Sequence, residues 1–346
     1  MKDIKDVTKP LKRTRPSPPS AHDVARLAGV SQAAVSRAFT PGASIAKTTR
    51  ERVMLAADEL GYRPNLLARS LIRGVSDLVG IVIGNTRNPF FFVALEELSA
   101  RLSRAGKHIL VFTAEGGENA DVQVEDLLRY RVDALLLMSA NISQPLAEKC
   151  RRDGIPLIFF NRRPRWDIDF ASVTGANVPG AEAIARHLLE QGYRRPAYLG
   201  GPLDSPTNNE RQAAFLGVLQ AEGLGEIPRV NGHFERAGAI EAARTLLRLD
   251  PQPDAIFCAS DFIAMATLEV ARFEFGLDIG RQIGIAGFDD ILEASWPSFD
   301  LTTYSQPVVP MIDKVMELVS DTSGEDLSAQ IVVEGALRKR GSTRRD

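Results

Sequence analysis

The chain has 346 residues, of which 44% are hydrophobic and 25% are charged, a composition close to that of average folded globular proteins. This length predicts two or three domains and allows a large core without disulfides or a structural metal. The two cysteines and four histidines are scattered, which excludes a disulfide framework and a cysteine-rich zinc site. No apolar run approaches the roughly 18 residues of a membrane helix, and the charged N-terminus is not a secretory signal. We therefore expect a soluble, cytoplasmic protein that contains no metal ion or other cofactor.

Charge is distributed unevenly along the chain. Residues 1–75 hold 14 Lys and Arg against 6 Asp and Glu, a net charge of +8. Residues 76–346 hold 28 against 38, a net charge of −10. A basic head on an acidic body indicates that only the head binds a polyanion. A solvated basic tail is the alternative, and it fits residues 1–19, which contain four prolines and predict a disordered extension.

Two short helices are predicted directly after this extension. Ser20 and Asp23 form a capping-box pattern at the start of the first helix, and Gly29 ends it. Ser31 caps a second helix over residues 32–39. Two helices joined by a Gly-Val-Ser turn are typical of the helix-turn-helix motif.

Two further helices are expected before residue 78, where the pattern of apolar and polar residues changes. A third helix is predicted to begin at Thr48, with Glu51 completing a second capping box, and to end at Gly61. Asn65 caps a short helix over residues 66–71, and a polar stretch follows it. The predicted domains are a disordered basic extension (1–19), a helix-turn-helix domain (20–64), a hinge helix with linker (65–77) and a body (78–346).

The body predicts an α/β fold with parallel sheets. Short apolar runs alternate with amphipathic helices, and two groups of strand–helix units predict two similar lobes. The expected strands are 78–83, 108–112, 134–138, 156–160, 196–199, 255–259, 283–288 and 331–337. The expected helices include 91–105, 178–191, 211–222, 237–249 and 261–276.

The second helix of a helix-turn-helix lies in the major groove, where its exposed early residues contact base edges. In this chain those residues are Gln32, Ala33, Ser36 and Arg37. Gln pairs with adenine, Arg pairs with guanine, and Ser binds a base or a phosphate. A three-helix bundle without a ligand is the alternative, but the order of caps, glycine and basic side chains favours DNA binding.

Motifs along nearly the whole chain resemble one known family. In the head they are Asp23-Val-Ala-Arg-Leu-Ala-Gly-Val-Ser31, Val35-Ser-Arg37, Arg50-Glu-Arg-Val53, Glu59-Leu-Gly-Tyr-Arg-Pro-Asn65 and Ala68-Arg-Ser-Leu71. In the body they are Asn88-Pro-Phe-Phe91, Leu199-Gly-Gly-Pro202, Arg211-Gln-Ala-Ala-Phe215, Ser260-Asp261, Gly287-Phe-Asp-Asp290, Leu301-Thr-Thr303, Gln306-Pro307 and Arg340-Gly-Ser-Thr343. Their order and spacing resemble the LacI/GalR family of bacterial transcriptional regulators. The resemblance implies a homodimeric regulator whose body is similar to periplasmic sugar-binding proteins, with two lobes that close on an effector. It places the lobes at approximately 78–173 with 306–327, and 174–305 with 328–346.

The resemblance also assigns DNA contacts. The matching positions are Ser31, Gln32, Ala33, Ser36 and Arg37 in the recognition helix, and Asn65, Ala68, Arg69 and Leu71 in the hinge helix. The hinge helix of the family folds on the operator, and Leu71 matches a leucine that wedges into the central minor-groove step. An ordinary apolar contact in a linker is the alternative for Leu71. Alanines at 33 and 34, where relatives often carry larger or polar side chains, leave fewer base contacts and favour readout of DNA shape.

The body carries polar and aromatic residues where an effector would bind. Ligands of open α/β sheets bind beyond the C-terminal ends of the strands. The residues expected there are Asn88, Phe90–Phe92, Asn161–Arg163, Ser260-Asp261 and Asp289-Asp290, with Arg211 at the start of a helix. Amide, guanidinium and carboxylate groups beside an aromatic wall suit a polyhydroxylated ligand.

The resemblance narrows this set. The positions that match the family's effector site are Phe90, Phe91, Asn161, Arg211, Phe234, Ser260 and Asp289. Asn161 replaces a common aspartate beside Arg162 and Arg163, which favours an acidic sugar or a sugar phosphate. The structural alternatives are that Asp289 caps a turn, that Arg211 forms a surface ion pair, and that Phe90–Phe92 pack in the core.

Two other function classes compete with a regulator. A periplasmic-type binding protein fits the body but leaves the basic head unexplained. An enzyme lacks its motifs, because no Gly-x-Gly-x-x-Gly, phosphate-binding loop, Gly-x-Ser-x-Gly elbow or metal cluster is visible. We therefore expect a non-enzymatic homodimer that binds double-stranded operator DNA and a small effector, which acts as inducer or as corepressor. No heptad repeat follows Leu337, so a coiled-coil tetramer is not expected.

Overall fold

The computed structural model describes residues 19–40, 42–63, 75–114, 119–164, 166, 170–320 and 328–345. The chain divides into two compact units, residues 1–76 and 77–346, and each is described by itself. The extension predicted over residues 1–19 falls, apart from Pro19, outside the described residues, as does the hinge helix predicted over 66–71. Within the described ranges, no helix has both the length and the apolar character needed to cross a membrane.

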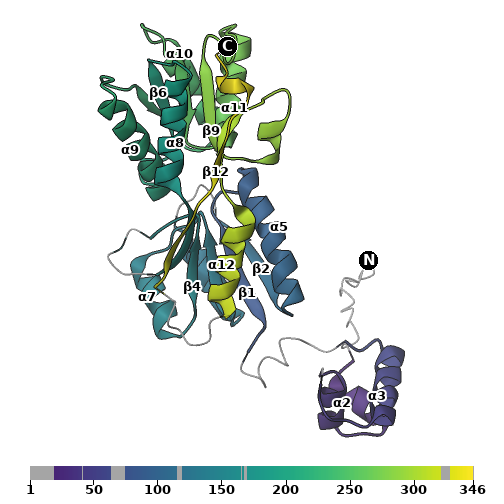
Figure 1. Ribbon diagram of the computed structural model, residues 1–346. Helices are drawn as coiled ribbons and strands as arrows, with labels where there is room; N and C mark the ends of the chain where they lie inside the picture. The colour runs from purple at the N-terminus through teal and green to yellow at the C-terminus, as the bar shows by residue number, and fades with distance from the viewer. Residues whose placement is uncertain are drawn as a thin grey trace, which may run out of the picture. The chain divides into compact units, whose positions relative to one another are not determined.

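The first unit is a bundle of short helices (Figure 1). They are α1 (Ala21–Ala28), α2 (Gln32–Ala38) and α3 (Lys47–Leu60). Each contributes one fully buried valine to the core, namely Val24, Val35 and Val53. Buried alanines fill the remaining space, so the helices approach one another closely.

The predicted caps of α1 are confirmed. The Ser20 hydroxyl accepts from the Asp23 backbone N–H, and the Asp23 carboxylate accepts from the Ser20 backbone N–H. Gly29 ends α1 and Gly61 ends α3, with φ values of 61° and 64° in the left-handed region that glycine adopts without strain.

The capping box predicted at Thr48 and Glu51 is wrong. Helix α3 begins at Lys47 and its N-cap is Ala46, which has no side-chain acceptor for a helix N–H. Thr48 is therefore already inside the first turn, and its hydroxyl cannot act as the cap.

The first lobe of the body contains, within the described residues, a six-stranded parallel sheet in the order β11-β5-β4-β3-β1-β2. Its strands are β1 (Leu78–Ile83), β2 (His108–Thr113), β3 (Ala134–Met138), β4 (Leu157–Phe160), β5 (Ala171–Gly175) and β11 (Gln330–Val333). Its helices are α5 (Pro89–Arg104), α6 (Asp121–Arg129), α7 (Gln144–Arg152) and α12 (Val308–Ser320). Alternate residues of β3 point to opposite faces, so Leu136 and Met138 pack with α5 while Leu135 and Leu137 pack with α6 and α7.

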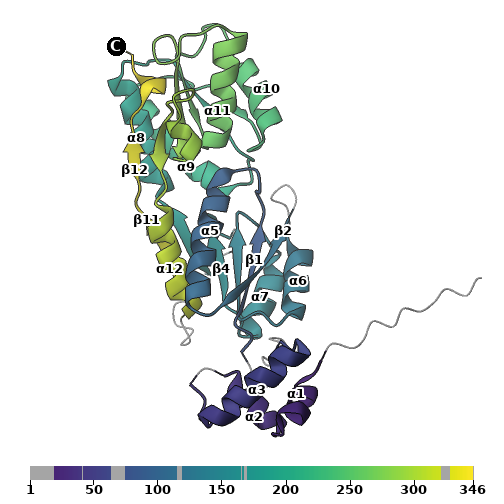
Figure 2. The same cartoon turned by 90° about the vertical axis from the view of Figure 1, so that its right-hand side faces the viewer.

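The second lobe contains a sheet that also has six strands within the described residues, in the order β12-β10-β9-β8-β6-β7. Its strands are β6 (Pro196–Gly200), β7 (Arg229–Asn231), β8 (Ala255–Cys258), β9 (Gly284–Asp289), β10 (Thr302–Ser305) and β12 (Ala336–Arg338). Its α-helices are α8 (Asn177–Glu190), α9 (Pro206–Ala221), α10 (Arg236–Leu247) and α11 (Asp261–Glu269). Helices α8 and α9 pack together, and so do α10 and α11 (Figure 2). Only β12 is antiparallel among the described strand pairs.

The predicted α/β class and the two parallel-sheet lobes are confirmed. Most expected strands match the observed ones to within one residue at each end. The unpredicted strands β5, β7 and β10 are short and rich in Ser, Thr and Gly or charged residues, so they lack a continuous apolar run.

The single strand predicted over 331–337 is wrong, because the segment forms two strands in different lobes. β11 pairs with β5 of the first sheet, and β12 pairs with β10 of the second. Gly335 lies between them, where its backbone N–H donates to the Tyr304 hydroxyl and an added Cβ would lie 1.9 Å from the Ser305 carbonyl oxygen. Because glycine has no Cβ, the chain can pass close to this carbonyl where it leaves the first sheet and joins the second.

The predicted lobe boundaries also need correction. We expected residues 328–346 to belong to the second lobe, but β11 adds a strand to the first. We expected the second lobe to begin at residue 174, but β5 continues to Gly175. The chain passes between the lobes after β5, after β10 and after β11, since crossing at a strand end leaves the ladder hydrogen bonds intact.

Two predicted helices have different limits. Helix α9 begins at Pro206, because Ser205 caps it and proline is favoured at the first helical position, so Arg211 lies in the second turn rather than at the start. The helix expected over 261–276 is α-helical only to Glu269 and continues as a π-helical turn, Val270–Glu274.

Replacement of Gly335 by alanine tests the crossing point. The new Cβ would overlap the Ser305 carbonyl, so we expect Gly335→Ala to lower the free energy of unfolding by about 1–3 kcal/mol in urea denaturation. Gly217→Ala is the control, because Gly217 lies inside α9 with no atom within 4 Å of an added Cβ. That variant should gain about 0.4–1 kcal/mol. Equal effects at both positions would contradict the packing argument.

Candidate functional site

The predicted DNA-contacting residues of α2 lie on one exposed face. Gln32, Ala33, Ser36 and Arg37 are exposed, whereas Ala34, Val35 and Ala38 are buried against the other helices. The Ser31 hydroxyl accepts from the Ala34 backbone N–H at 3.2 Å and fixes the start of the helix. The helix therefore presents an amide, a hydroxyl and a guanidinium to the solvent.

Ala34 does not belong to this face. We expected the alanines at 33 and 34 to be two positions with reduced base contact, but Ala34 is buried in the core. Asn65, Ala68, Arg69 and Leu71 lie outside the described residues.

Several of the residues expected to bind an effector lie at the C-terminal ends of the strands, and hydrogen bonds from Asn88 to Asp289 and from Thr207 to the Asn161 carbonyl join the two lobes there. Asn88 caps α5 after β1, Asn161 follows β4, Ser260 caps α11 after β8, and Asp289 ends β9. Asn161 has φ 54° and Asp289 has φ 130°, so both adopt backbone conformations that are uncommon for residues other than glycine. Such strain is typical of residues held in place for a function.

Arg211 is a buried charge and not a surface residue. Its Nε donates to the Asn177 side-chain oxygen at 2.9 Å, and its Nη1 donates to the Ala259 carbonyl at 2.6 Å. Its guanidinium carbon lies 3.6 Å from the centroid of the Phe288 ring. Only 2% of the residue is exposed, so the surface ion pair that we considered is wrong. Burial lowers the pKa of Arg211, and the nearby Asp289 carboxylate opposes this effect.

Asp289 connects the two lobes. Its Oδ2 accepts from the Asn88 side-chain amide at 2.9 Å, and its Oδ1 accepts from the Gln306 side-chain amide at 2.6 Å. Oδ1 also lies 3.8 Å from Arg211 Nη1. The alternative for Asp289 was that it only caps a turn. Its carboxylate instead bridges elements of both lobes.

A second buried carboxyl lies beside this pair. Asp261 accepts from the Thr303 hydroxyl at 2.6 Å and from the Ile291 backbone N–H at 3.0 Å. Burial and the neighbouring Asp289 raise the pKa of Asp261 to about 8. Burial also raises the pKa of Asp289, while Arg211 and the Asn88 hydrogen bond lower it. The two buried carboxyls repel each other, which disfavours the state in which both are charged.

Asn177 and Glu210 hold Arg211 in place, and sequence reasoning missed both. The Asn177 amide nitrogen donates to Glu210 Oε2 at 2.7 Å while its oxygen accepts from Arg211. Glu210 Oε1 also lies 3.8 Å from Arg163 Nη1 of the first lobe. Asn177 begins α8 directly after β5. If β5 had been predicted as a strand, Asn177 would have been recognised as a polar residue at a strand end.

The aromatic residues divide into two kinds. Phe90 and Phe91 are buried in the core, where Phe90 stacks on Phe160 with ring centroids 6.1 Å apart. The core alternative is therefore right for these two residues and wrong for Phe92, which is exposed. Phe234 is half-buried and has φ 56°. Its ring lies where a side chain at Gly201 would be, because an added Cβ at Gly201 would lie 2.2 Å from it.

Several buried polar atoms in this region lack a protein hydrogen-bond partner among the described residues. They are Asn161 Oδ1, Arg163 Nε, Arg211 Nη2, Ser260 Oγ and Gln306 Oε1. A buried polar atom without a partner costs about 1–3 kcal/mol, and such atoms are rare in folded proteins. Because donors and acceptors are mixed, the set matches the hydroxyl groups of a ligand, each of which donates and accepts.

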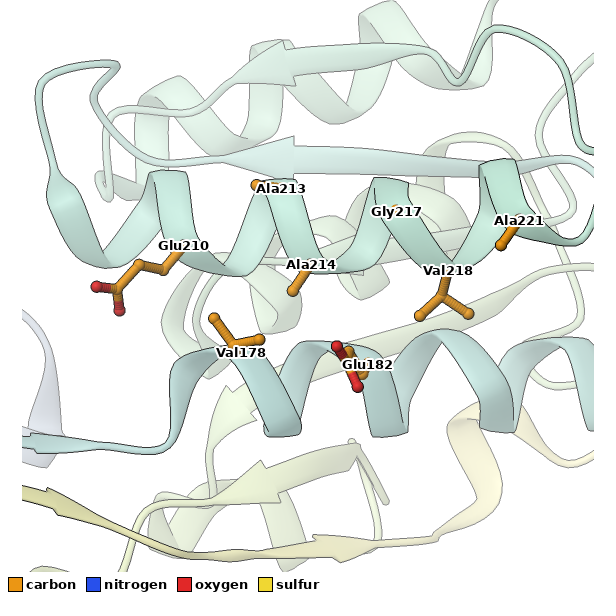
Figure 3. Close-up of a pocket in the computed structure, with 8 residues that line it drawn as sticks. All are labelled: Val178, Glu182, Glu210, Ala213, Ala214, Gly217, Val218 and Ala221. Carbon is orange, nitrogen blue, oxygen red and sulfur yellow. The ribbon is translucent and has the colours of Figure 1, made fainter.

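A cavity of about 600 Å³ lies between α8 and α9 and shares Glu210 with the group around Arg211 (Figure 3). It is lined by Val178, Glu182, Glu210, Ala213, Ala214, Gly217, Val218 and Ala221. Two carboxylates are its only charged lining groups, and none of its lining residues was predicted to bind the effector. In the described ranges, no three His, Cys, Asp or Glu side chains are grouped as a metal site.

Comparison with known proteins gives family matches to both units. Residues 20–65 match the family of bacterial regulatory proteins, lacI family, and residues 185–343 match the periplasmic binding protein-like domain. The ribose operon repressor of Escherichia coli (strain K12) is 31% identical over 304 residues, which cover 86% of this chain and 90% of that protein.

Solved structures have the same fold. A crystal structure of the lac repressor dimer bound to operator and the anti-inducer ONPF has a TM-score of 0.83 at 24% identity, over 95% of this chain and 100% of that one. A complex of the transcriptional regulator CelR with cellobiose has a TM-score of 0.69 at 28% identity, over 94% of this chain and 99% of that one.

Removal of one charge from the Arg211–Asp289 pair tests its contribution to stability. Asp289→Asn leaves the buried guanidinium without its nearest counter-charge, so we expect the free energy of unfolding to fall by about 3–5 kcal/mol in urea denaturation at pH 7. Arg211→Met should cause a loss of similar size. The double variant should lose less than the sum, because neither charge remains buried alone. Additive losses would show that the two side chains do not interact.

Proposed function

Because the chain belongs to the lacI family of bacterial regulatory proteins, which are DNA-binding transcriptional regulators and not enzymes, we propose that it is a ligand-responsive repressor. As a homodimer it binds a near-palindromic operator, and a small polyhydroxylated effector, a sugar or sugar derivative, changes its affinity for that operator. The observation that carries the effector part is the group of partnerless polar atoms where the lobes meet.

The exposed face of α2 supports the DNA-binding part. In this proposal Gln32 and Arg37 read base edges, Ser31 and Ser36 contact bases or phosphates, and Ala33 contacts an apolar part of the groove. Asn65, Ala68, Arg69 and Leu71 act in the minor groove at the centre of the operator.

Exposed apolar side chains support the homodimer. On the second lobe Phe273, Leu292 and Trp296 are exposed, and the Arg272 guanidinium, beside Phe273, donates to the Ser298 carbonyl beyond Trp296. Phe92 and Val93 are exposed on α5 of the first lobe. Large exposed apolar groups of this kind are typical of surfaces that a partner covers. We assign them to the contact between two copies of the chain.

The effector site in this proposal consists of Asn161, Arg211, Phe234, Ser260 and Asp289. Asn161, Arg211 and Ser260 each have one buried polar atom without a protein partner, and the Phe234 ring provides an apolar wall. Phe90 and Phe91 support the site from the core. One relative of this chain is the ribose operon repressor, and the similar structure of CelR is a complex with cellobiose. Both comparisons support a sugar as the class of effector.

Asp289 supplies a physical link between effector binding and lobe arrangement. Its two oxygens bond amides of Asn88 and Gln306. A ligand hydroxyl that bonds Asp289 exchanges with these amides, so effector affinity differs between lobe arrangements. That difference is what any coupling between effector and operator requires.

Selection from random duplex DNA tests the DNA-binding function. The full chain should enrich a two-fold-related motif, and Arg37→Ala should weaken binding to that motif by about 1–3 kcal/mol because one bidentate base contact is lost. Binding to random DNA should change much less. Affinities are measured at fixed, physiological salt.

Arg281→Ala is the matched control, since it removes one exposed positive charge from the second lobe. It should leave binding to the selected motif unchanged. Failure to enrich any motif would refute the operator-binding function and favour a small-molecule binding protein without a DNA role.

A thermal-shift panel tests the effector function. The panel contains ribose, cellobiose, sugar acids and sugar phosphates. A ligand at a hundredfold excess over its Kd stabilises the folded state by about 2.7 kcal/mol and raises Tm. Ser260→Ala removes a hydroxyl that has no protein partner, so it should leave Tm of the free protein unchanged but reduce the ligand-induced shift.

Glu182→Gln, in the cavity between α8 and α9, is the control for this panel. It should keep the full ligand-induced shift. A shift that is lost in Glu182→Gln and kept in Ser260→Ala would place the effector in that cavity instead.

A further inference from the structure

One edge of the first lobe is basic although the body is acidic. The edge consists of the turns and last helical residues that precede β1 to β4, namely residues 75–77, 104–107, 129–133 and 149–156. We call it the basic rim. It holds seven Lys and Arg against three Asp, whereas residues 76–346 as a whole hold 28 basic against 38 acidic residues.

The corresponding edge of the second lobe has the opposite charge. It consists of the segments that precede β6 to β9, which are residues 190–195, 221–228, 247–254 and 274–283. These segments hold four basic and seven acidic residues. Cations at helix C-termini stabilise the helix dipole, but that effect applies equally to both lobes. It therefore does not explain why only the first lobe is basic there.

Three arginines of the basic rim are available for a partner. Arg104 ends α5, Arg131 precedes β3, and Arg152 ends α7. All three are exposed, and no acidic side chain of the described residues forms an ion pair with them. Lys107 and Arg129 are different, since they pair with Asp133 at 3.9 Å and with Asp126 at 2.9 Å.

The chain connects the basic rim to the head. β1 begins at Leu78 on this edge, and in the sheet it lies between β2 and β3. Figure 2 shows β1 beside β2. Residues 64–76 join Arg63 of the head to Asp77. Thirteen residues span at most about 45 Å when fully extended. The covalent connection therefore limits how far Asp77, at the rim, can lie from Arg63 of the head.

We propose that the basic rim binds phosphates of the duplex that the head holds, so that the body contributes sequence-independent affinity. This inference rests on the DNA-binding part of the proposed function. Exposed guanidinium groups suit phosphate oxygens, and each phosphate neutralised releases condensed counterions. The acidic remainder of the body is repelled by the same duplex, so the rim is the part of the body that approaches it.

The salt dependence of binding to random-sequence duplex DNA tests the proposal. We measure Kd of the full chain from about 50 to 200 mM NaCl, a range over which each phosphate contact adds about 0.9 to the slope of log K against log salt concentration. The triple variant Arg104→Gln, Arg131→Gln and Arg152→Gln should reduce the magnitude of this slope by up to about 3 for each protomer that binds.

Two matched variants separate a local contact from a general charge effect. Arg229→Gln, Arg248→Gln and Arg281→Gln together remove three exposed arginines from the corresponding region of the second lobe and should leave the slope unchanged. Replacement of the three rim arginines by lysine keeps the charge and should also preserve the slope. Equal slope changes in the two glutamine variants, no change in either, or loss of the slope in the lysine variant would each overturn the proposal.

Failure of the proposed function has a different signature. If the wild-type chain shows no salt-dependent binding, or if Arg37→Ala leaves binding to the selected motif intact, the head does not bind DNA as proposed. Loss of the slope in the rim variant alone, with the head-dependent motif still selected, supports the rim.

Discussion

The structure depends on one buried ion pair, Arg211 with Asp289. Removal of a guanidinium and a carboxylate from water costs several kcal/mol for each ion unless hydrogen bonds replace the lost hydration. Arg211 receives that replacement from its own lobe, through the Asn177 side chain, the Ala259 carbonyl and the Phe288 ring. Asp289 receives it from the Asn88 and Gln306 amides. Arg211 compensates the charge of Asp289 within the second lobe, and the Asn88 amide adds a hydrogen bond from the first lobe.

The segments that connect the two lobes also contact this ion pair or residues beside it. The chain crosses after β5, after β10 and after β11, and the residues at these crossings contact the pair or its neighbours. Gln306 directly follows β10 and bonds Asp289, and Gly335 between β11 and β12 bonds the Tyr304 hydroxyl. Gln306 therefore links Asp289 to one of the segments that cross between the lobes.

The distribution of charge separates the tasks of the two units. The head carries a net charge of +8 and the body −10, so the polyanion is attracted to one end of the chain and repelled by the rest. The basic rim modifies this division, because it places positive charge at the edge where the chain enters the body. The corresponding edge of the second lobe is acidic. Since both lobes have the same fold, the fold alone does not explain the positive charge of the rim.

The sequence by itself determined the features that depend on neighbouring residues. The caps at Ser20 and Gly61, the apolar strands of both sheets and the exposed face of α2 follow from capping, periodicity and side-chain polarity. Of the candidate site, the strand pattern pointed to Ser260 and Asp289, because residues at the ends of strands can be recognised from it. The resemblance to a family pointed to Arg211, which lies in the second turn of α9. Only the tertiary structure decided that residues 331–337 divide between two sheets, that Arg211 is buried, and that Asn177 and Glu210 orient it. These features depend on which distant segments pack together, and no local pattern of residues records that choice.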